Sequence, residues 1–274
     1  MRAIDAYVRN LDRLMIVTLA FTAACAGALL TVGIKLGVDL KGGTMLVLKS
    51  NQDPDTLARQ ASRVLGVPDV QAVRSSRGVI LLQVPKYLSA GDASRLERSL
   101  HVKIESMQTV GPALGRAFWR SVKIAVPLAI VAVAAIVFAI FRRPLLSATV
   151  LAALALDLID ALGLMSLTGI PLTLASFAGL LMIIGYAVDS NILLSMYTVK
   201  RRRARTVEAS IRESFKTGMT MTLTTSAAAG ALFLLSASEA IFEIAAVVVF
   251  GLLADVLNTW VFNAWVIKEK IAGR

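Results

Sequence analysis

Long apolar runs divide the chain into six segments, each close to the ~20 residues that an α-helix needs to cross a membrane. A stretch of mixed composition separates the first run from the other five, and isolated acidic or hydroxyl residues interrupt four of the later runs. The pattern predicts membrane-spanning helices over residues 14–34, 122–141, 145–167, 172–194, 218–235 and 240–267.

Composition agrees with a membrane protein. The chain has 274 residues, 57% of them hydrophobic, and a mean hydropathy of +0.72. It holds one cysteine, Cys25, and one histidine, His101, which excludes an internal disulfide and leaves too few soft ligands for a zinc-type site. The sequence therefore predicts no metal and no cofactor, and His101 is interpreted as a structural or surface residue.

Basic residues predict the orientation. They lie in the N-terminal tail, in the turn at 142–143, in the C-terminal tail and in the loop 195–217, which has seven of them and includes "KRRRAR" at 200–205. The short turns "TGIP" and "SASE" have none. The positive-inside rule then places both termini in the cytoplasm and residues 35–121 outside. The "KRRRAR" run is interpreted mainly as a topology anchor, with contact to anionic lipid or a cytosolic partner as the alternative. The net charge of +11 does not make nucleic acid a predicted partner, because the placement of Lys and Arg matters more than their total in a membrane protein.

Two short segments read as amphipathic helices. The first has an apolar face that we expect to lie on the inner membrane surface: Ile4, Tyr7, Val8 and Leu11. The second is predicted before the fifth span, from the spacing of Val207, Ile211 and Phe215.

Residues 44–111 have the composition of a soluble domain. Strand patterns in "TMLVLKS", "VQAVRSS", "GVILLQV" and "KIESMQTV" alternate with helix patterns in "DPDTLARQASRVLG" and "SAGDASRLERSLHV", and a short turn is predicted at Arg77 and Gly78. The order βαββαβ predicts a ferredoxin-like α+β domain. The chain then divides into 1–34 (amphipathic segment and first span), 35–121 (external domain) and 122–274 (five-span bundle).

The stretch "GVDLKGGT" at 37–44 joins the first span to this domain. Gly42 and Gly43 permit backbone angles that other residues avoid, and Asp39 can cap a turn.

Four aspartates lie inside predicted spans: Asp157 and Asp160 in the third, Asp189 in the fourth and Asp255 in the sixth. Intramembrane carboxyl groups are costly and often mark proton or ion paths. The alternative is that neutral acids hold the helices together by hydrogen bonds to Ser, Thr and Asn. Expected partners are Asn191 and the fifth-span hydroxyls of Thr222, Thr224 and Thr225.

A functional role is favoured for Asp157 and Asp189, which lie on adjacent spans. For Asp160 and Asp255, both the functional role and the structural role stay open. Glu243 is expected to reach the membrane interface.

A family resemblance is carried by "GVDLKGGT" together with "ALDLIDALGLMSLTGIPL", "IGYAVDSNILL", "FKTGMTMTLTTSAAAGA" and "FGLLADVLNTWVFNA". With these stretches the chain resembles the SecF family of protein-export membrane proteins, and its archaeal members more than its bacterial ones. The resemblance covers nearly the whole chain. It implies half of a transporter of the RND superfamily, completed by SecD, which assists export of unfolded polypeptide beside the SecY translocon. Asp157 matches the family's proton-linked carboxyl group, and Asp189 falls in its fourth-span motif. One departure is Tyr197, which stands twelve residues after Gly185, where many members have Arg.

Two other functions fit parts of the pattern. A half-size RND-like exporter of lipid or small molecules needs a second half and a substrate path. An intramembrane aspartyl protease would pair Asp157 with Asp189, but "GYAV" precedes Asp189 where such enzymes have Gly-x-Gly-Asp. The chain is therefore not expected to be an enzyme.

Overall fold

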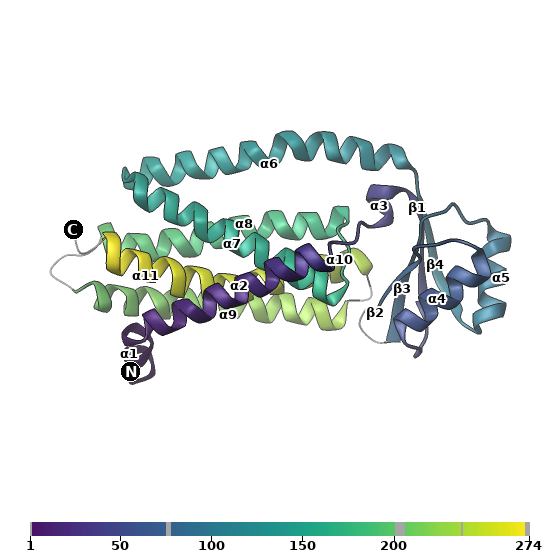
Figure 1. Cartoon of the computed structure of the whole chain (residues 1–274), viewed down its shortest axis with the longest axis horizontal. Helices are drawn as coiled ribbons and strands as arrows, with labels where there is room; N and C mark the ends of the chain where they lie inside the picture. The colour runs from purple at the N-terminus through teal and green to yellow at the C-terminus, as the bar shows by residue number, and fades with distance from the viewer. Residues whose placement is uncertain (1, 75–77, 201–205, 237, 272–274) are drawn as a thin grey trace.

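A computed structural model describes residues 2–74, 78–200, 206–236 and 238–271 (Figure 1). Within these ranges, an elongated helical bundle carries an α+β domain at one end (Figure 1). Six helices of the described part are long and apolar enough to cross a membrane. The six-span prediction is therefore confirmed.

The spans differ from the predicted ranges mainly where they begin. Their bounds are α2 (Leu11–Thr31), α6 (Pro112–Phe141), α7 (Pro144–Thr168), α8 (Leu174–Ser195), α9 (Val207–Leu235) and α10 (Glu239–Leu257). Helix α8 continues as the π-helix η2 (Met196–Lys200), and α10 continues through η3 (Asn258–Asn263), α11 (Ala264–Val266) and η4 (Ile267–Ile271).

The predicted separate helix before the fifth span is wrong, because α9 runs without a break from Val207. The Thr206 hydroxyl accepts a hydrogen bond from the Ala209 amide at 3.2 Å and so caps this long helix. No Pro or Gly interrupts the chain between 207 and 217. Residues 201–205 of the predicted basic loop lie outside the described residues, so its contact with anionic lipid stays a prediction.

The α+β domain has the predicted element order. It consists of β1 (Gly43–Lys49), α4 (Pro54–Leu65), β2 (Gln71–Arg74), β3 (Val79–Val84), α5 (Ala90–Leu100) and β4 (Lys103–Val110). The antiparallel sheet has the order β2-β3-β1-β4, which is that of a ferredoxin-like unit. The predicted turn at Arg77 and Gly78 includes residues 75–77, which are not described.

Local chemistry explains the two helices of this domain. Asp53 caps α4 by accepting a hydrogen bond from the Thr56 amide at 3.0 Å, with Pro54 in the first turn. Ser89 and Asp92 form a reciprocal capping box at the start of α5. Alternate strand residues such as Leu46, Leu48, Ile80 and Leu82 are fully buried in a core shared with both helices. The opposite face of β1 is left to face the bundle.

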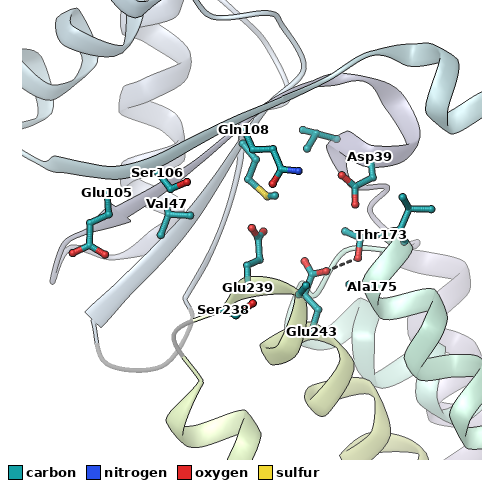
Figure 2. Close-up of a pocket in the computed structure, with 14 residues that line it drawn as sticks. Asp39, Val47, Glu105, Ser106, Gln108, Thr173, Ala175, Ser238, Glu239 and Glu243 are labelled. Atoms are coloured by element: carbon teal, nitrogen blue, oxygen red, sulfur yellow. Dashed lines mark hydrogen bonds between the residues drawn. The ribbon is translucent and has the colours of Figure 1, made fainter.

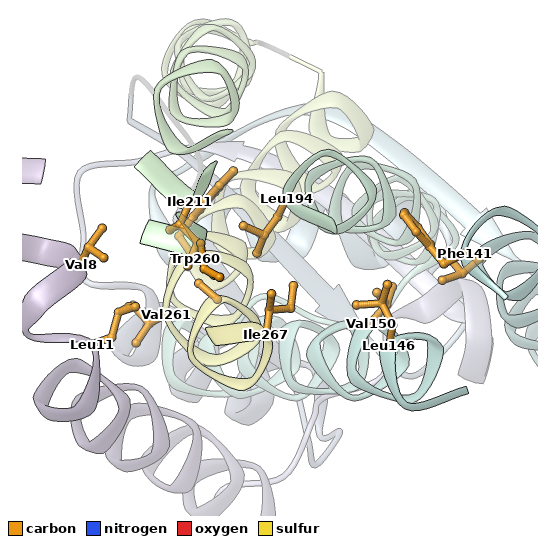
Figure 3. Packing of buried hydrophobic residues seen from close by; sticks show 13 residues of the cluster. Val8, Leu11, Phe141, Leu146, Val150, Leu194, Ile211, Trp260, Val261 and Ile267 are labelled. Carbon is orange, nitrogen blue, oxygen red and sulfur yellow. The ribbon is translucent and has the colours of Figure 1, made fainter. Parts of the chain in front are cut away.

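A second apolar core closes the end of the bundle farthest from this domain (Figure 3). Its centre is Trp260, which Gly218 of α9 approaches so closely that an added Cβ would lie 2.0 Å from the ring. Helix α1 (Arg2–Arg9) packs here: the Tyr7 ring lies 4.7 Å from that of Phe215, and its hydroxyl donates a hydrogen bond to the Trp260 carbonyl. Tyr7, Val8 and Leu11 of the predicted apolar face therefore pack against the chain itself. That α1 lies on the inner membrane surface stays a prediction.

Candidate functional site

The double-glycine stretch forms a short helix and a tight entry into the sheet. Helix α3 (Val38–Lys41) ends at Gly42, with φ of +84°, and Gly43 follows at +144°. A Cβ on Gly43 would lie 2.4 Å from the Val84 carbonyl oxygen. Both glycines are therefore required by backbone geometry, as the sequence predicted.

This stretch also ties the domain to the bundle. The Gly37 amide donates to the Leu172 carbonyl at 2.8 Å, and the Leu172 amide donates to the Lys35 carbonyl at 2.7 Å. Asp39 is half-buried and accepts a backbone hydrogen bond from Leu174, at the start of α8. Burial raises the pKa of the Asp39 carboxyl group above its ordinary value, and the Leu174 bond offsets this only in part.

A buried polar core lies in the middle of the bundle. Asp157 and Asp160 of α7 and Asp255 of α10 are at most 1% exposed. The Asn258 side-chain amide donates to Asp157 Oδ1 at 2.9 Å and to Asp160 Oδ2 at 2.8 Å. One amide group therefore bridges two carboxyl groups that lie one helical turn apart.

Further hydrogen bonds extend this polar core across three helices. The Thr22 hydroxyl of α2 donates to Asp160 Oδ2 at 3.1 Å. The Thr259 hydroxyl donates to Asp255 Oδ1 at 2.6 Å and accepts from the Asn191 amide at 2.8 Å. Asn263 in turn donates to Asn191 Oδ1. Of the predicted partners within the described residues, Asn191 is linked to the acids, through the Thr259 hydroxyl.

Two geometric features create room for the core. Asn258, Thr259 and Asn263 lie on the π-helix η3, a conformation that is rare and frequent at functional sites. Helices α2 and α7 approach closely at Gly163, where an added Cβ would lie 2.5 Å from the Cys25 Cβ. This close approach helps to bring the Thr22 hydroxyl of α2 to Asp160.

The carboxyl groups of the core are only partly satisfied. Asp157 Oδ2, Asp160 Oδ1 and Asp255 Oδ2 are buried without a hydrogen-bond partner among the described residues. The sequence of α7 and α10 contains no Lys or Arg at all. A negative charge here has no cation within its own helices to balance it, which is the setting in which carboxyl groups exchange protons.

The structure separates Asp189 from these acids. Its side chain is exposed on α8, whereas Asp157 is fully buried, so the two residues lie in different environments. The functional role of each stays a prediction. The fifth-span hydroxyls are not the partners either. Thr224 is exposed and donates to carbonyl groups of Thr220 and Met221 in its own helix, and Thr225 is partly exposed. Thr222 is buried but does not bond to the acids in the described part of the chain.

Sequence reasoning missed the actual partners, Thr22, Asn258 and Thr259. The signal was available, because "DVLNTWVFN" places three polar side chains after Asp255 inside an apolar run.

A second cluster of acids lines an open cleft of about 470 Å³ between the sheet and the ends of α8 and α10 (Figure 2). Asp39, Glu239 and Glu243 point into it. Glu243 is 2% exposed and accepts a hydrogen bond from the Thr173 hydroxyl, so the prediction that it reaches the membrane interface is wrong. We call this feature the acidic cleft. No group of three or more His, Cys, Asp or Glu side chains among the described residues is arranged to hold a metal ion.

Fold and site together define a multi-spanning membrane protein of the transport class, with carboxyl groups inside its bundle and a small α+β domain. The family model "Protein export membrane protein SecD/SecF, C-terminal" matches residues 92–271, and "SecD/SecF GG Motif" matches residues 27–54, which contain Asp39, Gly42 and Gly43. The chain belongs to the SecD/SecF family of protein-export membrane proteins. It is accordingly a transport protein and not an enzyme.

Similar proteins place it beside SecF. The chain is 70% identical to the protein-export membrane protein SecF of Methanopyrus kandleri over 98% of both chains. It is 40% identical to the SecF of Pyrococcus furiosus, over 88% of this chain and 82% of that one. The crystal structure of SecDF from Thermus thermophilus matches with a TM-score of 0.76 at 24% identity, which shows a shared fold over 95% of this chain. The chain spans only 38% of the length of that SecDF chain.

Proposed function

We propose that this protein is the SecF-type subunit of a protein-export complex and works with SecD to assist the passage of unfolded polypeptide beside the SecY translocon. The family match and the identity to SecF proteins support this. The fold shared with 38% of a SecDF chain supports a complex in which SecD supplies the second half of the bundle. Co-purification with SecD from native membranes in mild detergent tests it; stable isolation of the chain alone would contradict it.

The exposed side of α8 is the surface that we assign to SecD. Leu181, Met182, Gly185 and Asp189 share one exposed stripe of this helix. A carboxyl group that faces lipid is costly, and such groups normally face a helix bundle or water. A SecD helix laid along this stripe would remove Asp189 from lipid, which gives its exposed position a reason.

We propose that both termini are cytoplasmic and that residues 35–121 are external. Helix α1 and the segment around α11 lie at the end of the bundle opposite the α+β domain, as this orientation requires (Figure 1). The basic residues of the tails and of the loop 195–217 then lie on the cytoplasmic side. Anionic lipid is the partner we assign to that loop.

We further propose that the buried polar core couples export to the proton gradient. The observation that carries this is the set of three buried carboxyl groups with free oxygens and no cation in their helices. Asp157 shares the Asn258 amide with Asp160, and Asp255 connects through Thr259 to Asn191. A proton gained or lost by one carboxyl group changes which of these hydrogen bonds can form, and so changes how α7 and α10 pack.

The replacement Asp157→Asn tests this coupling. Asn keeps the size and an acceptor for the Asn258 amide but cannot carry a proton. In membrane vesicles that contain the complete complex, the increase in export produced by a proton gradient should disappear, while the export that remains without a gradient should not change. Thr224→Val, on the exposed side of α9, serves as the control. If Asp157→Asn keeps the full gradient-dependent increase, the acids only hold the helices together.

No observation favours the two other functions considered above. A protease needs two acids in one shared geometry, and the structure holds Asp157 inside the bundle and Asp189 on its surface.

A further inference from the structure

The acidic cleft has no counterion among the residues that line it. Fourteen residues line it, and none is Lys, Arg or His. Asp39, Glu239 and Glu243 lie close enough for their charges to interact. Glu105 adds a fourth carboxyl group farther along the cleft, where the bulge between Val47 and Leu48 interrupts the pairing of β1 with β4.

Helix capping explains part of this charge. Asp39 accepts a hydrogen bond at the start of α8, and Glu239 is the first residue of α10, where a negative charge complements the helix dipole. Helix capping does not explain the carboxyl group of Glu243, because this residue lies one turn further into α10.

Glu243 is the residue that points to a ligand. Only 2% of its surface is exposed, and its Oε2 atom accepts a hydrogen bond from the Thr173 hydroxyl. Its Oε1 atom has no partner in the described structure and faces the cleft, as does the unpartnered Oε1 of Glu239 (Figure 2). A buried carboxylate is expensive unless a positive or hydrogen-bonding group meets it.

The size of the cleft decides which cation fits. The acids are not arranged to close on a metal ion, and a space of about 470 Å³ exceeds what a bare ion fills. It matches a long side chain that ends in an ammonium or guanidinium group, which can donate to several carboxylate oxygens at once. Met45, Val47 and Leu174 offer apolar surface for the aliphatic part of such a side chain.

The sheet offers a place for the main chain that would carry this side chain. Strand β4 is an edge strand of the sheet and pairs with β1 on one side among the described residues. Its outer edge presents backbone groups that the sheet does not use. One of them, the Ile104 amide, donates to Glu97 of α5. Ser106 and Gln108 of β4 line the cleft. An extended polypeptide that pairs with β4 would therefore pass beside the acids.

We propose that the acidic cleft is a binding site for a lysine or arginine side chain of an extended polypeptide, and that the occupant is the polypeptide being exported. This rests on the proposed function, since an export subunit meets such chains at its external face. The ion pairs form with Glu243, Glu239 and Asp39, and β4 holds the backbone. Occupation draws the sheet and the ends of α8 and α10 together around one side chain.

Peptide binding to the purified complex with SecD tests this. The probes are fluorescent 12-residue Ser/Val peptides that differ only in two central positions, occupied by Lys, Gln or Glu. Fluorescence anisotropy should show the Lys peptide binding most tightly, with an affinity that falls as salt is added. Glu243→Gln should weaken the Lys peptide by at least about tenfold and leave the weak Gln peptide unchanged.

Two variants keep the result interpretable. Asp55→Asn removes an exposed acid of α4 and should bind like the native protein. Glu239→Gln repeats the test at a half-buried position if Glu243→Gln unfolds. Equal affinity for Lys and Gln peptides, native affinity in both glutamine variants, or no peptide binding because SecD fills the cleft would each overturn the proposal. Peptide binding needs no proton gradient, so a failure of proton coupling leaves this result intact, and the reverse also holds.

Discussion

The molecule holds two groups of carboxyl side chains without cations, and they differ in access. The carboxyl groups of the buried polar core are at most 1% exposed and accept hydrogen bonds from side chains of α2 and η3. The acidic cleft opens between the α+β domain and the helix ends, and Thr173 is the one described residue whose side chain donates a hydrogen bond to its acids. The first arrangement suits an internal proton site and the second suits a ligand that arrives from solution.

Removal of the Asn258 amide should have the largest effect on stability. Asn258→Ala leaves two buried carboxyl groups without their shared donor, which we expect to cost about 3 kcal/mol. Thermal unfolding in detergent, followed by Trp fluorescence, measures this. The comparison in the cleft, Glu239→Ala, removes a half-buried acid and should cost less. Equal losses at the two places would contradict the proposed difference in access.

Chemical labelling compares access directly. A water-soluble carbodiimide with an amine tag should modify Asp39 and Glu239, both half-buried at the cleft, in the folded protein. Asp157, Asp160 and Asp255 should stay unlabelled, since their exposure is at most 1%. Peptide mapping by mass spectrometry gives the extent of labelling at each acid. Labelling of the core acids as fast as that of Asp39 and Glu239 would contradict the proposed difference in access.

The pH dependence of stability should carry a small contribution from Asp39. Its pKa in the folded protein is raised above the ordinary value of 3.8, mainly by burial. The folded state therefore binds this proton more tightly than the unfolded state, so stability falls as pH rises from about 3.8 through the raised pKa. Asp39→Asn should remove that part of the slope. Titration of the unfolding temperature in acid checks this, and an unchanged slope in the variant would contradict it.

Two exposed acids of the same domain should behave in the opposite way. Hydrogen bonds from Thr56 and Ser89 lower the pKa values of Asp53 and Asp92, respectively. Their contribution is present above the ordinary Asp value and is lost as pH falls through the lowered pKa. This contribution should persist in Asp39→Asn, and Asp53→Asn or Asp92→Asn should each remove part of it.

The smallest effect is expected on the exposed side of α9. Thr224 bonds only to carbonyl groups of its own helix. Thr224→Val should change stability by no more than about 0.5 kcal/mol. A larger loss would mean that Thr224 contacts a partner helix, as Asp189 is proposed to do.

Sequence patterning predicted the fold closely, because each span and strand depends on local periodicity. The βαββαβ order, the six spans and the need for Gly42 and Gly43 all follow from such local signals. Some span ends were not predicted: α6 and α9 begin before their apolar runs and continue through polar residues.

The candidate site was predicted only in part. Asp157, Asp160 and Asp255 were identified as buried acids, but which of them meet depends on the rotation of each helix about its axis. That rotation is set by packing contacts such as Gly163 against Cys25, and by the π-helix η3, which shifts the helical phase after Asp255. Neither feature is visible in hydropathy. For the same reason, hydropathy does not show that the Asp189 side chain lies on the exposed side of α8.

Infrared difference spectroscopy of the complex tests most directly whether the buried polar core carries protons. Spectra recorded as the pH is lowered across the working range should show the carbonyl stretch of a protonated carboxylic acid in the native protein, and Asp157→Asn should lose or shift this band. Glu243→Gln serves as the control and should keep it. A native spectrum without any such band that depends on Asp157 would contradict proton coupling and leave these acids as hydrogen-bonded contacts between helices.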